Sequence, residues 1–246
     1  MKIVGIIQAR ASSSRLPNKI HLPLTREHSL LEFLIKRISK VNIDWWLATT
    51  VSFSDDFTAS VGKSLGLETF RGEVENVLSR FLTIGRSVHA DWIVRVTADN
   101  PFVEASRILE LISSTTEMST QPIVVTEDLV NPQFPVGYLP EIVSFEGLEL
   151  VAASLSENRA YHESNVTSYL KPNYLKVFTN ETLPRRPELR WTIDTNLDLN
   201  MARNILKLAD CDPLELEYNQ ILNILDYNPW IKDINSGVMQ KSKNEI

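Results

Sequence analysis

The amino-acid sequence predicts a single α/β domain whose mostly parallel β-sheet is flanked by helices. The chain has 246 residues, of which 43% are hydrophobic and 23% charged, values typical of one large globular domain. Strand-like and helix-like segments alternate strictly over residues 2–113, as they do when helices cover both faces of a parallel sheet. We therefore expect one domain over residues 1–235, followed by a polar, disordered tail at residues 236–246.

The elements of the first half follow from hydrophobic patterns and capping signals. A β-branched apolar run at residues 2–8 predicts a strand that is buried on both faces. Ser29 and Glu32 have the spacing of a capping box ahead of a helix at residues 30–39. Gly66 stands at the C-cap position of the next helix. The remaining elements expected here are strands at 44–50, 67–70 and 91–97 and helices at 54–65, 73–88 and 103–113.

The alternation loosens beyond residue 120. Three prolines and one glycine within residues 131–140 predict an irregular loop. Thr195 and Asp198 have the spacing of helix-capping residues, so a helix is expected from there to about Leu208. The other expected elements are helices at 145–157 and 163–170 and strands at 175–178 and 189–193.

Charge and cysteine content argue against several classes of function. The chain carries 25 Lys and Arg against 31 Asp and Glu, and it has no basic block, so duplex nucleic acid is not an expected partner. Cys211 is the only cysteine, which leaves no intrachain disulfide. The apolar run at residues 3–7 is too short for a signal peptide, and no run is long enough to span a membrane. We expect a cytoplasmic protein that binds no membrane.

The loop after the first strand combines positive charge with small side chains. Residues 8–19 contain Arg10, Arg15 and Lys19 with serines at 12–14 between them, at the carboxyl end of a strand where open α/β sheets bind ligands. The loop has no glycine, so it is neither a dinucleotide fingerprint nor a Walker A loop. Its cations are suited to binding phosphate oxygens. The alternative is a solvated basic turn.

Two aspartates each follow an apolar strand-like run. Asp99 lies in the sequence TADNP and Asp194 in RWTIDT. Carboxylates at strand ends are suited to Mg²⁺, which takes one or two of them together with substrate phosphates, so the pair is expected to converge on one or two metal ions. The alternatives are an Asx-turn or helix cap at Asp99 and a helix N-cap at Asp194.

A glycine follows the third predicted strand. Gly72, in the sequence FRGE, permits the close backbone approach that a flat nucleobase needs. The alternative is a plain turn between a strand and a helix.

Together these segments resemble the cytidylyltransferases of the acylneuraminate and 3-deoxy-manno-octulosonate type, especially the branch called spore coat polysaccharide biosynthesis protein F. The opening pattern IIQARxxSxRLPxKxL is matched by residues 6–19, with His21-Leu22 in place of the final leucine. The patterns RGxxxxVLxRF, TGDxP and RWTxDTxxDL are matched by residues 71–81, 97–101 and 190–199. The motifs occur in the family's order.

The resemblance implies a Rossmann-like, GT-A-like nucleotidyltransferase fold and transfer of CMP from CTP to a sugar or other small acceptor in polysaccharide- or capsule-type biosynthesis. It implies Mg²⁺ as cofactor and leaves a homodimer possible. The residues that it points to are Arg10, Arg15 and Lys19 for catalysis, Gln8, Ala9, Arg10, Ser12, Arg71, Gly72, Asn76 and Asp99 for the nucleotide, Asp99 and Asp194 for the metal, and Tyr138 and Glu141 for the acceptor.

The chain departs from the family mainly on the acceptor side. Ala98 replaces a glycine, and a DGLDVE-like segment reads VGYLPE here, so that it keeps only Gly137 and Glu141. The usual EHVT reads SNVT at residues 164–167. Because residues 131–141 contain one carboxylate and no cation, we expect an acceptor that is smaller or more apolar than the standard ulosonic acids, such as one carrying its own phosphate or phosphonate.

Two other functions remain open. One is a nucleotidyltransferase that uses another NTP or a phosphorylated or phosphonate acceptor. The other is a nucleotide-binding protein without catalysis, against which the three cations and both aspartates argue.

Overall fold

The structure is a computed structural model that describes every residue except 116–117, 119–120, 129, 155–158 and 241–246. Its strands are β1 Ile3–Gln8, β2 Asp44–Thr50, β3 Glu68–Gly72, β4 Trp92–Thr97, β5 Val124–Thr126, β6 Glu141–Ser144 and β7 Leu175–Val177. Its α-helices are α1 Leu30–Ile38, α2 Asp56–Ser64, α3 Val77–Ser87, α4 Ala105–Ser114, α5 Phe145–Ser154, α6 Arg159–Ser164, α7 Lys171–Tyr174, α8 Asn196–Lys207, α9 Tyr218–Tyr227 and α10 Trp230–Asp233. The 3-10 helices are η1 Lys19–His21, η2 Phe53–Asp55 and η3 Pro213–Glu215.

The strands form one sheet in the order β3-β2-β1-β4-β6-β5-β7. β1 lies parallel between β2 and β4, and β3 is parallel to β2. Only β6 runs against its described neighbours β4 and β5. The predicted single, mostly parallel α/β domain is confirmed, and the parallel strands all end at the same edge of the sheet.

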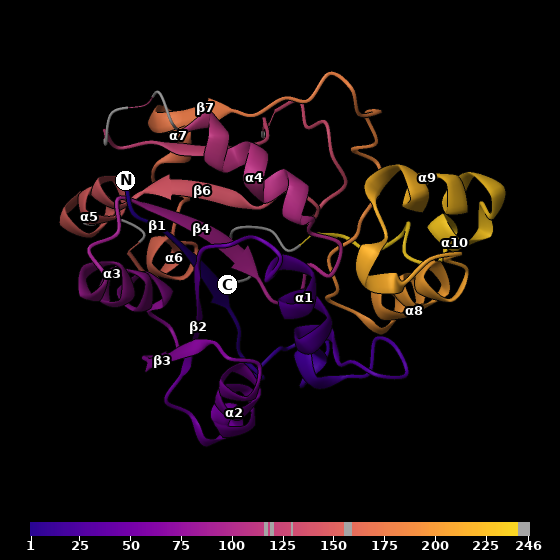
Figure 1. The fold of residues 1–246 in the computed structure, drawn as a ribbon, viewed down its shortest axis with the longest axis horizontal. Helices are drawn as coiled ribbons and strands as arrows, with labels where there is room; N and C mark the ends of the chain where they lie inside the picture. The colour runs from indigo at the N-terminus through magenta and orange to yellow at the C-terminus, as the bar shows by residue number, and fades with distance from the viewer. Residues whose placement is uncertain (116–117, 119–120, 129, 155–158, 241–246) are drawn as a thin grey trace.

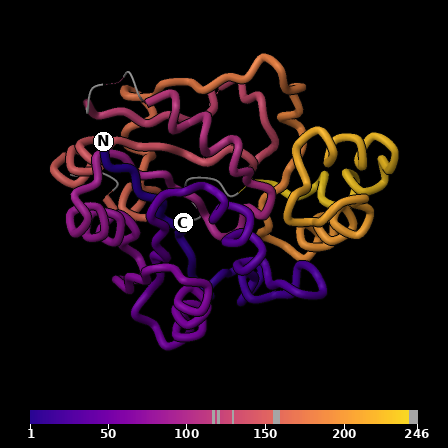
Figure 2. Tube along the Cα trace, viewed as in Figure 1, coloured from indigo at the N-terminus to yellow at the C-terminus, as the bar shows by residue number. Residues whose placement is uncertain are grey.

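Helices cover both faces of this sheet, as Figure 1 shows. Successive residues of β4 point to opposite faces. Val94 belongs to a core that includes residues of α1, α4, α8 and α9, whereas Ile93 belongs to a core that includes residues of α3 and α5. Helices α8–α10 form a group at one side of the sheet (Figure 2), and α8 and α9 share the first of these cores.

The capping residues act as the sequence predicts. The Ser29 hydroxyl and the Glu32 backbone and carboxylate form a reciprocal capping box at α1. Gly66 adopts a φ of +79° just after α2. Helix α3 begins at Val77, later than expected, because the Asn76 side chain accepts a 2.8 Å bond from the Ser79 N–H and caps the helix there.

The strand predicted at residues 189–193 is wrong. This segment makes one isolated bridge, between Val136 and Arg190, and joins no strand of the sheet. Its N–H groups bond instead to irregular backbone: those of Trp191 and Thr192 donate to the Val136 carbonyl at 2.8 and 3.0 Å. The apolar run is buried as predicted, but its partner is the proline-containing loop.

The helix predicted at residues 163–170 is also wrong. Helix α6 ends at Ser164, and turns lead from there to α7. At this end of the helix Asn165 donates both its backbone N–H and its side-chain amide to the Tyr161 carbonyl, each at 2.9 Å. The predicted helix at 145–157 corresponds to α5, and its last three residues lie outside the described residues.

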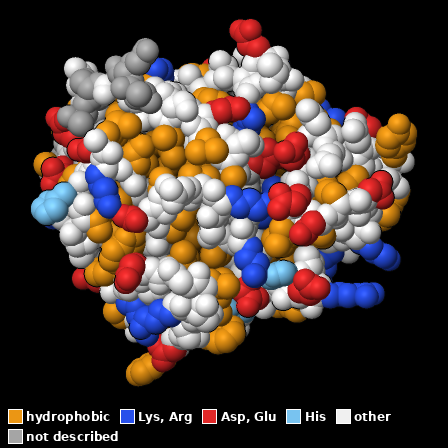
Figure 3. Space-filling model, in the orientation of Figure 1, with side chains coloured by type: hydrophobic (Ala, Val, Ile, Leu, Met, Phe, Trp, Pro, Cys, Tyr) orange, Lys and Arg blue, Asp and Glu red, His pale blue; other side chains and the backbone are white. Residues whose placement is uncertain are grey.

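The surface carries charges of both signs. Figure 3 shows acidic and basic side chains interspersed on the face that it presents, in keeping with the net charge of −6. Within the described part of the chain, no helix is long and apolar enough to cross a membrane.

Candidate active site

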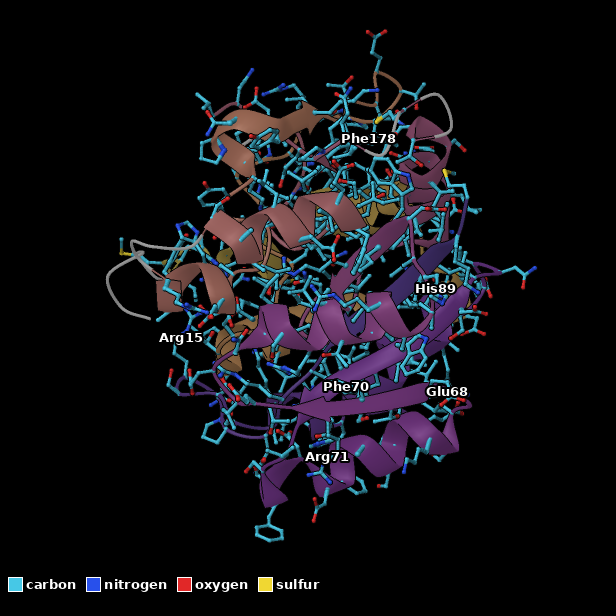
Figure 4. All side chains as sticks on the ribbon, turned by 90° about the vertical axis from the view of Figure 1, so that its left-hand side faces the viewer. Arg15, Glu68, Phe70, Arg71, His89 and Phe178 are labelled. Atoms are coloured by element: carbon cyan, nitrogen blue, oxygen red, sulfur yellow. The ribbon has the colours of Figure 1, made fainter. Side chains whose placement is uncertain are left out.

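A cavity of about 240 Å³ lies at the carboxyl ends of β1 and β4. In Figure 4 the arrow of β3 points towards the edge where Arg15 lies, whereas Glu68 and His89 lie at the opposite edge. The residues that line the cavity are Gln8, Ala9, Arg10, Ser12, Ser13, Ser14, Arg15, Lys19, Ile20, Thr97, Ala98, Asp99 and Asp194. The fold thus brings the basic loop and both aspartates together. A larger groove of about 620 Å³, lined by residues 23–28 and by α8 residues, contains none of the predicted site residues.

A buried carboxylate holds the basic loop in place. The N–H of Ala11 donates to Asp55 Oδ1 at 2.6 Å, and Asp55 also accepts bonds from the hydroxyls of Thr50 and Thr58. Asp55 is 0% exposed, so the loop is anchored to the start of α2. Asn18, with a φ of 56°, then turns the chain into η1. The sequence analysis missed Asp55, because nothing in the sequence signals that its partner lies 44 residues away.

Lys19 lies between the two aspartates. Its Nζ donates to Asp99 Oδ2 at 2.7 Å, to Asp194 Oδ1 at 2.8 Å and to the Ile193 carbonyl at 2.9 Å. Burial favours the neutral amine, but the charges of Asp99 and Asp194 outweigh it and raise the pKa of Lys19. Because one ammonium group bonds both carboxylates, they lie well within the roughly 10 Å beyond which they could not share a two-metal site.

Asp194 is surrounded by cations. Besides Lys19, it pairs with Arg15 at 2.7 Å and with Arg190 at 2.5 Å. Burial alone would raise its pKa, but Lys19, Arg15 and Arg190 lower it. The sequence analysis gave Arg190 no role, although it is the first residue of the RWT motif. Arg15 and Arg190 also contact residues 239–240, which fall in the predicted tail; residues 241–246 lie outside the described residues.

The capping alternative for Asp194 does not hold. Helix α8 is capped by Thr195 and Asp198, because the side chain of each accepts a bond from the backbone N–H of the other. The N–H of Asp194 itself donates to the Asp198 carboxylate at 3.0 Å. The Asp194 carboxylate is therefore directed into the cavity. The N–H of Ile193 donates to the Asp99 carbonyl at 2.8 Å, which ties the two aspartate-bearing segments together.

These two carboxylates fit a magnesium ion. Among the described residues, no group of three or more His, Cys, Asp or Glu side chains could hold a metal. Mg²⁺ commonly takes only one or two carboxylates and completes its shell with water and substrate phosphates. Asp99 and Asp194, which both bond Lys19 Nζ in the cavity, would be such a partial set.

Comparison with known proteins identifies the family. A model described as cytidylyltransferase matches residues 4–224. The chain belongs to the cytidylyltransferase family. It is 36% identical over its whole length to an uncharacterized protein of Methanocaldococcus jannaschii, of which it covers 99%. It is 28% identical to spore coat polysaccharide biosynthesis protein SpsF of Bacillus subtilis, over 92% of this chain and 95% of that protein.

Solved structures agree with the fold of this cytidylyltransferase. A cytidylyltransferase from Leptospira borgpetersenii matches it with a TM-score of 0.86 at 24% identity, covering 98% of this chain and 99% of that one. A CMP:2-keto-3-deoxy-manno-octonic acid synthetase complexed with CTP matches it with a TM-score of 0.65 at 16% identity, covering 84% and 99% of the two chains. The family resemblance and the nucleotidyltransferase fold are therefore confirmed.

Three residues predicted to face the nucleotide do not line the cavity of this cytidylyltransferase. Arg71 donates to the carbonyls of Thr50 and Ser52, both at 2.8 Å, and so fastens the segment before α2. Asn76 caps α3. Gly72 packs on a buried arginine, because a Cβ there would lie 2.6 Å from Arg80 Cγ.

Arg80 is a further residue to which the sequence analysis gave no role. It is 1% exposed, and burial together with the charge of Arg10 lowers its pKa to about 10. Arg10 is exposed and lines the cavity. Arg10 thus presents a positive charge to the cavity, which suits an anionic ligand.

Charged side chains also meet at β6, beside the cavity. Arg95 donates to Glu141 at 2.8 Å and to Gln8, a cavity residue, at 3.0 Å. Thr167 donates to Glu141 at 2.7 Å, and Lys171 pairs with the same carboxylate. Burial would raise the pKa of Glu141, but Lys171 and Arg95 hold it well below its usual range. The fold thus supplies from outside the two cations that the segment 131–141 lacks.

Tyr138 does not fit the acceptor role predicted for it. It is 0% exposed, packs against Trp191 and Tyr218 with ring centroids 5.5 and 4.7 Å apart, and donates its hydroxyl to Glu104 at 3.0 Å. An acceptor cannot reach it in this structure. The proline-containing loop around Tyr138 places this side chain in the aromatic core, which the sequence pattern did not reveal.

Proposed function

We propose that this protein transfers CMP from CTP to a hydroxyl of a small, sugar-type acceptor and releases pyrophosphate, as a step in polysaccharide- or capsule-type biosynthesis. The observation that carries the proposal is the placement of Lys19 between Asp99 and Asp194 in a cavity that also contains Arg10 and Arg15. Family membership supports the transferred group, and the name of the Bacillus subtilis relative supports the pathway class. The single cysteine is in keeping with a cytoplasmic enzyme, where disulfides are rare.

The reaction needs positioning and charge neutralisation more than covalent catalysis. An acceptor oxygen forms a bond to the α-phosphorus of CTP, the bond from that phosphorus to the β-phosphate oxygen breaks, and the hydroxyl proton passes to solvent. Arg10, Arg15 and Lys19 bind the triphosphate and stabilise the charge on the departing pyrophosphate.

Asp99 and Asp194 are the residues that would hold Mg²⁺. When bound, the ion neutralises phosphate charge and lowers the pKa of the acceptor hydroxyl. No histidine lines the cavity, so we assign no histidine base.

The acceptor is best sought among two chemical classes. The sequence pattern favours a small phosphate- or phosphonate-bearing alcohol. Arg95 and Lys171 both pair with the carboxylate of Glu141, so they are the cations beside the cavity that suit a carboxylate-bearing sugar.

The proposal is tested by pyrophosphate release. Each of the four NTPs is incubated with Mg²⁺, the protein and either a ulosonic acid or a phosphate- or phosphonate-bearing alcohol. We expect release with CTP and one acceptor class, and none from Asp194→Asn. Release with another NTP would support the alternative nucleotide, and no release with any pair would support a protein that only binds nucleotides.

A further inference from the structure

The bonding of Lys19 shows an ammonium group with every donor occupied. Its three N–H groups match the three acceptors on Asp99, Asp194 and Ile193, at 2.7, 2.8 and 2.9 Å. The side chain is 10% exposed, so little water competes for these bonds. The ammonium therefore occupies the space between the two carboxylates.

We propose that Lys19 holds the place of the divalent cation in the free protein, so that metal binding depends on nucleotide binding. This inference rests on the metal role proposed for Asp99 and Asp194. It adds that the free protein binds the metal weakly and that the triphosphate opens the site.

Electrostatics supports the dependence. A divalent cation shared by Asp99 and Asp194 needs the oxygens that Lys19 now bonds, and two cations in this space repel each other. Lys19 must therefore move, and a partly buried ammonium without acceptors is strongly disfavoured. A triphosphate provides it with new oxygen acceptors and provides the metal with further ligands.

The remaining contacts of Asp194 also make metal binding depend on nucleotide binding. Its Oδ1 bonds Lys19, and its Oδ2 bonds Arg15 and Arg190. Both oxygens are thus satisfied by cations of the chain. An anionic ligand that draws Lys19 and Arg15 towards itself would free Oδ1 and leave Oδ2 paired with Arg190 alone.

The test measures Mn²⁺ binding to the full-length protein without nucleotide, by electron paramagnetic resonance of the free ion. Lys19→Met removes the competing charge and keeps a linear side chain that is one heavy atom shorter. We expect this variant to bind Mn²⁺ at least about tenfold more tightly than wild type, because the state in which Lys19 does not occupy the two carboxylates is then no longer a minor one. Lys19→Gln keeps a donor without the charge and is expected to gain affinity as well.

Two further variants locate the effect. Lys40→Met also removes one positive charge, from an exposed ion pair with Glu215, and should leave Mn²⁺ affinity unchanged. Adding Asp194→Asn to Lys19→Met should abolish the gain. Thermal unfolding of each variant checks that it is folded.

The outcomes separate this inference from the proposed function. Equal Mn²⁺ affinity in wild type and both Lys19 variants would overturn the place-holding role. The place-holding role would also be overturned if wild type bound Mn²⁺ tightly without nucleotide and Asp194→Asn removed that binding. This result needs no Lys19 variant. The metal role itself fails if CTP binds wild type equally well with Mg²⁺ and with chelator.

Discussion

Replacing Gly137 by alanine perturbs the contact between the irregular loop and the aspartate-bearing segments. Gly137 has a φ of +90°, and a Cβ there would lie 2.7 Å from Asn100 Oδ1 and 2.7 and 2.8 Å from Thr192 Cβ and N. The backbone conformation costs an L-residue about 1–2 kcal/mol, and overpacking costs about 1–3 kcal/mol. We expect Gly137→Ala to lower the free energy of unfolding by the sum of these costs, about 2–5 kcal/mol.

Gly66→Ala is the matched control. Gly66 has a φ of +79°, but a Cβ there meets nothing within 4 Å. Its replacement should cost only the backbone part, about 1–2 kcal/mol, so the difference between the two variants measures the steric part. Urea unfolding gives both values, with an unchanged dependence on urea concentration showing that only stability has changed.

Gly137→Ala should also lower enzymatic activity. Asn100 and Thr192 are the chain neighbours of Asp99 and Ile193, which bond Lys19. A shift of either segment misplaces these acceptors, so kcat should fall in Gly137→Ala and stay near normal in Gly66→Ala. Equal stability losses in the two variants would refute the packing described here, and normal kcat in Gly137→Ala would refute its link to the site.

Three further predictions concern single side chains. Arg15→Ala and Lys19→Ala should each lower kcat roughly 10²-fold, as loss of a preorganised charged donor does, while Lys40→Ala leaves it unchanged. Near-normal turnover of either variant would show that the replaced residue has no catalytic role. Tyr138→Phe should cost about 1 kcal/mol of unfolding free energy through the lost bond to Glu104 and leave the acceptor KM unchanged, and a raised KM would restore its acceptor role. Burial raises the pKa of Glu127 to about 7 from 4.5. The folded protein therefore favours the neutral carboxyl, and this contribution to the free energy of unfolding is lost as the pH rises from 4.5 through about 7. Glu127→Gln should therefore gain stability over wild type from pH 5 to pH 8, by at most about 3 kcal/mol in urea unfolding, and a pH-independent difference would contradict this.

Local signals predicted much of the fold. The capping boxes at Ser29 and Thr195 mark helix starts that depend on residues three positions apart, and Gly66 marks a helix end through its own backbone. The convergence of Lys19 with Asp99 was also predictable, because β1 and β4 are parallel and their ends meet at one edge.

Long-range contacts were not predictable in the same way. The segment at 189–193 has the apolar pattern of a strand, but its hydrogen-bond partners lie in a loop that the chain forms some 50 residues earlier. Tyr138 and Arg71 carry polar groups that sequence alone cannot assign to solvent or to a buried partner, and both turn out to be bonded within the protein.

The central claim is that the cavity between the basic loop and the two aspartates binds CTP with Mg²⁺. Calorimetric titration of the wild-type protein with each NTP, in Mg²⁺ and in excess chelator, tests it most directly. We predict that CTP binds at least about tenfold more tightly than ATP, GTP or UTP, a difference of about 1.4 kcal/mol, and that chelator weakens its binding. A tenfold preference for GTP, or a CTP affinity that chelator leaves unchanged, would contradict the account.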